Sequence, residues 1–156
     1  MLRAMIEALS DYKVILPVVV GWGDMDAFAH VNNTVYFRYF EHARIAYFER
    51  ALVVPSSEGT AQATVAVPTG VGPILASASC RFKAPVRYPD RVQVGIRVSE
   101  LADDRFTMRY AIYSERLARI AAEGDGVIVA FDYGTGKKAS VPELWRERIA
   151  ELEGWR

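Results

Sequence analysis

The stretch that decides the fold is Trp22-Gly-Asp-Met-Asp-Ala-Phe-Ala-His-Val-Asn-Asn33, followed directly by the apolar segment Thr34–Phe48. The first part holds two acids, a histidine and two asparagines, which is typical of a loop. In the second part, apolar residues recur at spacings of three and four, which predicts a long helix enclosed by a sheet. The residues of this stripe are Tyr36, Tyr39, Phe40, Ala43, Ala46 and Tyr47.

The junction between this loop and this helix is suited to chemistry. Asn32 or Asn33 is the predicted N-cap, because its side-chain oxygen can accept a hydrogen bond from an unpaired backbone N–H. A helix N-terminus offers free N–H donors and a partial positive charge. Both properties suit a carbonyl oxygen that becomes an oxyanion, and Asp24, Asp26 and His30 lie just before this point.

Before the helix, Lys13–Val20 is apolar at nearly every position, which predicts a strand buried on both faces. Pro17 indicates an edge or a bulge in that strand. After the helix, residues 55–72 are rich in Ser, Thr, Gly and Pro and predict a loop, with a short strand at 63–67. Further strands are predicted at Ile74–Phe82, Arg91–Ser99, Arg105–Tyr113 and Arg119–Tyr133.

The order of these segments predicts one α+β domain over residues 1–156, with an antiparallel sheet around one long helix. Small residues in Ile74–Phe82 would let the helix pack close to that strand. Gly124 and Gly126 predict a bulge or a close backbone approach. Pro142 is expected to open a C-terminal helix that ends near Glu153.

Composition narrows the possible partners. The chain has 19 basic and 19 acidic residues and no net charge, which argues against broad attraction to nucleic acid or to a membrane surface. No apolar run is as long as a membrane span. Met1–Ser10 is a short amphipathic segment and lacks the features of a signal peptide. Cys80 is the only cysteine, so we expect no internal disulfide and a cytoplasmic location.

These residues resemble a known family. The motif Trp22–Asn33 before the helix is similar to that of the hotdog-fold acyl-CoA thioesterases of the 4-hydroxybenzoyl-CoA thioesterase type. The segments Ser77-Ala-Ser-Cys-Arg-Phe82 and Tyr88-Pro-Asp90 add to the likeness, as do Ala121, Glu123, Gly124 and Gly126. The resemblance covers residues 12–153. It implies a hotdog fold, a homodimer or homotetramer with sites at the interface, and no cofactor apart from the coenzyme A of the substrate.

The resemblance also implies roles for single residues. Asp26 matches the catalytic carboxylate, which attacks the thioester or activates water. Asn33 matches the residue whose backbone N–H faces the thioester carbonyl, and Tyr36 matches a tyrosine that lines the same region. Ala29 departs from the family, whose members usually have glycine there. A positive φ at that position would strain an alanine.

Other polar residues have weaker assignments. His30 could orient Asp26 or contact the substrate, and it could equally bond only to backbone. A basic group lies around the turn after Phe82 and could meet the phosphates of coenzyme A; its members are Arg81, Lys83, Arg87 and Arg91. A solvated basic strand edge is the structural alternative for each of them. We expect no metal site, because a second cysteine is missing and the histidine spacing fits no ligand pattern.

The function predicted from the sequence is therefore hydrolysis of an acyl- or aroyl-CoA thioester to a free acid and coenzyme A. Two alternatives stay open at this point. The same fold could bind acyl thioesters without reacting, as a binding or assembly module. It could also act on a thioester carried by acyl carrier protein.

Overall fold

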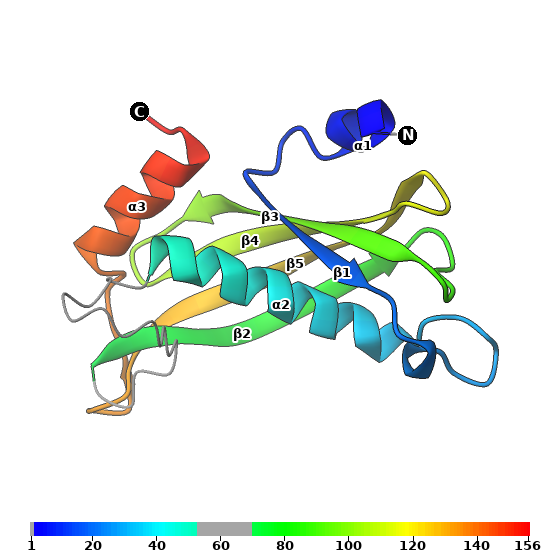
Figure 1. Ribbon diagram of the computed structural model, residues 1–156. Helices are drawn as coiled ribbons and strands as arrows, with labels where there is room; N and C mark the ends of the chain where they lie inside the picture. Colours follow the sequence, from blue (N-terminus) through cyan, green and yellow to red (C-terminus); the bar gives the residue numbers. More distant parts are fainter. Residues whose placement is uncertain (1, 53–69) are drawn as a thin grey trace, which may run out of the picture.

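The computed structural model describes residues 2–52 and 70–156 and shows an antiparallel sheet curled around one long helix (Figure 1). The helices are α1 (Leu2–Ala8), the 3₁₀ helix η1 (Trp22–Asp24), α2 (Asn33–Ala51) and α3 (Glu143–Glu153). The strands are β1 (Val14–Val19), β2 (Val71–Phe82), β3 (Arg91–Leu101), β4 (Arg105–Ser114), β5 (Arg119–Asp132) and β6 (Lys137–Lys138). This confirms the predicted α+β class. Most of the loop predicted at 55–72, with its strand at 63–67, lies outside the described residues.

The sheet has the strand order β1-β3-β4-β5-β2, with β6 paired to β5. β1 is therefore an edge strand, and the prediction that it is buried on both faces was wrong. Ile15 is 41% exposed and Val19 is 69% exposed, because the burial of β1 alternates and these residues lie on the face opposite to the one that packs on the core. The edge position explains Pro17, since an edge strand tolerates a residue that cannot donate a backbone hydrogen bond.

The core lies between α2 and the concave face of the sheet (Figure 1). Alternating residues of β3 and β4 supply this face, as the period-two pattern predicts. They are Val92, Val94, Ile96 and Val98 from β3, and Phe106, Met108, Tyr110 and Ile112 from β4. The helix is covered on one side only, because Arg38, Glu41 and His42 face solvent. The prediction that the sheet encloses the helix thus holds for only part of its circumference.

The helix also covers less of β2 than the sequence predicts. A register shift between Leu75 and Ser77 breaks the alternation of this strand. Ala76 and Ala78 are exposed, and of the small residues only Cys80 packs against the core. No helix in the two described segments is long and apolar enough to cross a membrane.

Burial affects the chemistry of the cysteine on β2. Removal from water raises the pKa of the Cys80 thiol to about 11. Because only the thiolate reacts with alkylating agents, we predict slow modification by iodoacetamide at pH 8. The rate should rise roughly tenfold for each pH unit and level off near the raised pKa. Mass spectrometry of the folded protein measures this, and rapid complete labelling at pH 8 would contradict the buried placement.

Close contact between α2, β2 and β5 depends on Gly124. A Cβ at this position would overlap the backbone oxygen of Ser79 and lie 2.6 Å from Cε2 of Phe40. Phe40 cannot give way, because its ring is stacked on Tyr110 with the centroids 4.5 Å apart. The close approach predicted for this glycine is confirmed.

We therefore predict that Gly124→Ala lowers the free energy of unfolding by about 1–3 kcal/mol, as overpacking of a core does. Gly23→Ala is the matched control, because nothing lies within 4 Å of the added Cβ. The control should change stability by about 0.5 kcal/mol or less. Urea unfolding of the three proteins measures both effects, and equal midpoints would show that Phe40 and β2 can move apart.

Candidate active site

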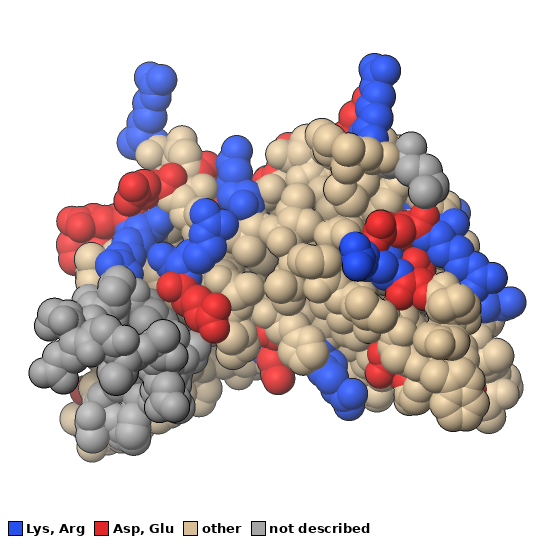
Figure 2. Space-filling view, viewed as in Figure 1, with Lys and Arg blue, Asp and Glu red and all other residues tan. Residues whose placement is uncertain are grey.

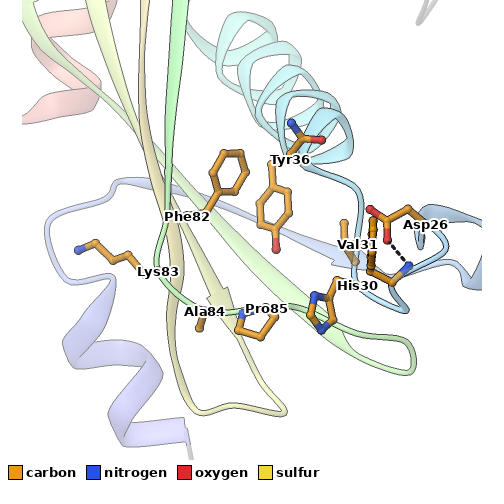
Figure 3. Close-up of a pocket in the computed structure, with 10 residues that line it drawn as sticks. Asp26, His30, Val31, Tyr36, Phe82, Lys83, Ala84 and Pro85 are labelled. Carbon is orange, nitrogen blue, oxygen red and sulfur yellow. Dashed lines mark hydrogen bonds between the residues drawn. The ribbon is translucent and has the colours of Figure 1, made fainter.

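The loop between β1 and α2 meets the turn between β2 and β3 at one end of the sheet (Figure 1). Val31 N–H donates to the Val86 carbonyl at 2.8 Å, and a bridge between Met25 and Val31 closes the base of the loop. Together the two segments and the start of α2 surround a hollow of about 520 Å³ (Figure 3). Its lining residues are Asp26, Phe28, His30, Val31, Asn33, Tyr36, Phe82, Lys83, Ala84 and Pro85.

Asp24 holds the loop in place. Its Oδ2 accepts hydrogen bonds from Gly21 N–H at 2.9 Å and from the Tyr39 hydroxyl at 2.7 Å. Its backbone carbonyl accepts from Asn32 N–H at 2.9 Å, directly before α2. Burial raises the pKa of Tyr39, and its bond to the Asp24 carboxylate raises the pKa further. Asp24 is thus a structural residue that ties the loop to the helix.

Asp26 is the carboxylate of the hollow. Its Oδ1 accepts from Phe28 N–H at 2.9 Å, an interaction drawn as a dashed line in Figure 3. Its Oδ2 has no hydrogen-bond partner among the residues that the structure describes. The Asx turn fixes one oxygen and leaves the other available to a ligand.

The start of α2 provides a hydrogen-bond donor to the same hollow. Asn32 is the N-cap, and its Oδ1 accepts from the backbone N–H of Thr34 at 2.9 Å and from the Thr34 hydroxyl at 2.8 Å. Val35 N–H donates to the Asn32 carbonyl at 2.9 Å. Within the described part of the chain, no acceptor faces the N–H of Asn33, which lines the hollow. The hollow is therefore lined by one residue with an unbonded carboxylate oxygen and by another with an unbonded backbone donor.

Tyr36 and Phe82 form an aromatic wall of the hollow. Their rings meet edge to face with centroids 5.0 Å apart, and Figure 3 shows them side by side. The Tyr36 hydroxyl accepts from Val86 N–H at 3.4 Å, and burial raises the pKa of this tyrosine. The sequence analysis did not identify Phe82 as a site residue. The alternating pattern places Phe82 on one face of a strand and does not indicate that this strand ends at the hollow.

His30 contacts an arginine instead of Asp26. The Arg87 guanidinium lies 3.1 Å from His30 Nε2. Since a guanidinium can only donate, this ring nitrogen acts as the acceptor. His30 meets Asp26 only through the backbone, where its carbonyl accepts from Asp26 N–H at 3.0 Å. Of the three alternatives for His30, the structure does not show the ring orienting the Asp26 carboxylate or bonded only to backbone. The residue lines the hollow, where a ligand could reach it.

The basic residues separate in the structure. Lys83 lines the hollow, but its ammonium pairs with Glu123 at 2.9 Å. Arg81 is exposed and does not line the hollow. The structure thus brings together Asp26, His30, Asn33, Tyr36 and Lys83, and it leaves Arg81 apart. In the described segments, no group of three or more His, Cys, Asp or Glu residues could hold a metal ion.

A family model of the thioesterase-like superfamily matches residues 20–149, which include the whole hollow. The chain belongs to the thioesterase-like superfamily. A candidate esterase of Aquifex aeolicus (strain VF5) is 31% identical over 120 residues, which cover 77% of this chain and 84% of that protein.

Solved structures agree with this membership. A thioesterase from Thermus thermophilus, crystallised with coenzyme A and zinc, is 32% identical with a TM-score of 0.76. The match covers 94% of this chain and 98% of that one. A thioesterase superfamily protein from Jannaschia sp. CCS1 is 25% identical with a TM-score of 0.78, over 96% of this chain and 91% of that one. These matches confirm the hotdog fold. They also show that this member of the superfamily is a thioester hydrolase.

The loop conformation at Ala29 yields a prediction for this site. Ala29 has a φ of 60°, in the left-handed region, and its N–H donates to the Asp26 carbonyl at 3.0 Å. We predict that Ala29→Gly raises the free energy of unfolding by up to about 1 kcal/mol, because relief of strain exceeds the entropy that glycine adds to the unfolded chain. Thermal melting tests this. A loss of stability would mean that the turn holds alanine without strain.

Proposed function

We propose that this thioesterase hydrolyses acyl- or aroyl-CoA thioesters with Asp26 as its catalytic carboxylate. The observation that carries the proposal is the shared hollow. Within the described part of the chain, it is lined both by Asp26, which has one unbonded carboxylate oxygen, and by Asn33, whose N–H has no acceptor. The thioester enters with its carbonyl oxygen toward the start of α2. The acyl group then lies along the aromatic wall made by Tyr36 and Phe82.

The helix N-terminus acts on the carbonyl oxygen. As the carbonyl carbon becomes tetrahedral, negative charge develops on this oxygen, and the Asn33 N–H and the positive end of the α2 dipole stabilise it. One such donor contributes about 3–4 kcal/mol of transition-state stabilisation in enzymes where it has been removed. Because Asn32 already satisfies Thr34 N–H, the cap keeps the donor geometry fixed without occupying Asn33.

Asp26 supplies the second half of the reaction by one of two routes. As a general base, it takes a proton from water, whose oxygen forms the new bond to the carbonyl carbon. As a nucleophile, it forms an anhydride that water then cleaves. Both routes break the same carbon–sulfur bond, release the coenzyme A thiolate, which takes up a proton, and leave the free acid.

Coenzyme A is the proposed carrier because the Thermus thermophilus thioesterase, at 32% identity, was crystallised with it. Together with the family resemblance, this makes coenzyme A the preferred carrier over acyl carrier protein. The proposal includes a homodimer or homotetramer in which two chains meet near the hollow, and action in the cytoplasm. Lys83 and His30, on the rim of the hollow, are the proposed contacts for the substrate beyond the thioester.

Thiol release from a panel of acyl- and aroyl-CoAs tests the proposal. Asp26→Asn should lower kcat by about 10²–10⁴-fold with little change in thermal stability, since it removes the acid–base or nucleophilic group. Asp103→Asn is the matched control, because Asp103 is exposed in the β3–β4 turn. It should keep full activity.

The same panel separates the enzyme from a silent binding module. Such a module would be stabilised by acyl-CoAs in thermal melting and would release no thiol. Full activity of Asp26→Asn would remove the proposed mechanism while leaving the reaction itself in place.

A further inference from the structure

A second hollow lies beside the first, where the β2–β3 turn meets the turn between β4 and β5. It has a volume of about 240 Å³ and is lined by Pro85, Arg87, Asp90, Arg116 and Leu117. Backbone contacts fix the two turns against each other, because Glu115 N–H donates to the Arg91 carbonyl at 3.0 Å. The proposed thioester chemistry uses none of its charged groups.

The acid of this second hollow is fully occupied. Asp90 Oδ1 accepts from Arg91 N–H at 2.7 Å and from Arg116 N–H at 3.0 Å. Its Oδ2 accepts from the Ser114 hydroxyl. The carboxylate therefore joins the two turns through hydrogen bonds from backbone N–H groups and a hydroxyl group. Among the described residues, the Asp90 carboxylate forms no ion pair with the guanidinium of Arg87 or with that of Arg116.

The two arginines are left without an acidic partner. Neighbouring cations are neutralised, since Lys83 pairs with Glu123 at 2.9 Å and Arg91 with Glu115 at 3.8 Å. Arg87 contacts the His30 ring, and no acidic side chain in the described segments pairs with Arg87 or Arg116. Two guanidiniums without an ion-pair partner at one hollow are suited to an anion, because their planar forks of donors match phosphate oxygens.

The two hollows are adjacent. Pro85 lines both of them, and Arg87 reaches from the second to His30 in the first. The segment from Phe82 to Arg87 spans at most about 17 Å when extended. That span is within reach of the pantetheine arm that separates the thioester from the phosphates of coenzyme A.

We propose that Arg87 and Arg116 form the subsite for the phosphate groups of the coenzyme A moiety. The inference rests on the proposed function and revises the basic group predicted from the sequence. It keeps Arg87, adds Arg116, and no longer assigns the phosphates to Arg81, Lys83 and Arg91. The chain has no net charge, so long-range attraction of phosphates by the molecule as a whole is not expected. Figure 2 shows that Lys and Arg are interspersed with Asp and Glu on the face it displays. Selectivity for a phosphorylated carrier is then assigned to the hollow that holds Arg87 and Arg116.

Calorimetric titration with free coenzyme A tests the subsite without any need for turnover. We compare the wild type with Arg87→Gln, Arg116→Gln and Arg119→Gln. Arg119 is the matched control, because it is exposed near the same turn and does not line the hollow. Loss of a charge-assisted hydrogen bond should raise the Kd of coenzyme A roughly tenfold or more for Arg87→Gln and Arg116→Gln. The control should stay within about twofold.

Pantetheine, which has the same arm and no phosphate, is the second probe. The Kd of pantetheine, or its inhibition constant, should be equal in the wild type and in Arg116→Gln. Unchanged coenzyme A affinity in both variants, no coenzyme A binding by the wild type, or an equal loss for pantetheine would each overturn the subsite. Thermal melting confirms that the variants are folded. If coenzyme A binds as predicted but no thioester is cleaved, the subsite stands and the proposed function fails.

Discussion

The structure depends on how the first turn of α2 satisfies its backbone donors. A helix begins with N–H groups that have no partner within the helix, and a side-chain cap, water or a ligand must satisfy them. Here the Asn32 side chain accepts from the N–H of Thr34, and the backbone carbonyl of Asp24 accepts from the N–H of Asn32. One donor, that of Asn33, remains at the hollow in the described part of the chain. The same cap that stabilises the fold therefore defines where a carbonyl oxygen can bind.

The sheet holds the other side of the site. β2 ends at Phe82, and the turn that follows contacts the loop through the bond between Val31 and Val86. The site is thus assembled from segments that are far apart in sequence, and the contact between α2 and β5 at Gly124 sets the distance between helix and sheet. Strain at Ala29 is tolerated because hydrogen bonds on both sides of the loop over-determine its shape.

Local patterns predicted much of this arrangement. The stripe of α2, the alternation of β3 and β4 and the cap at Asn32 depend on neighbours within a few residues, so the sequence shows them directly. The edge position of β1 depends on strand order, which Lys13–Val20 does not encode. The partners of Lys83 and of His30 depend on register and turn packing. Pattern reasoning therefore grouped the basic residues, and only the structure distinguished those with acidic partners from those without.

The central claim is that one thioester lies between Asn33 and Asp26. A crystal structure with a non-hydrolysable acyl-CoA analogue, in which a methylene replaces the thioester sulfur, tests it most directly. We predict that the analogue's carbonyl oxygen lies about 2.7–3.1 Å from Asn33 N, the range of effective oxyanion donors. The Asp26 carboxylate should lie about 3–3.5 Å from the carbonyl carbon, or one water molecule away. A carbonyl bound elsewhere, with Asp26 still held only by Phe28, would contradict the account.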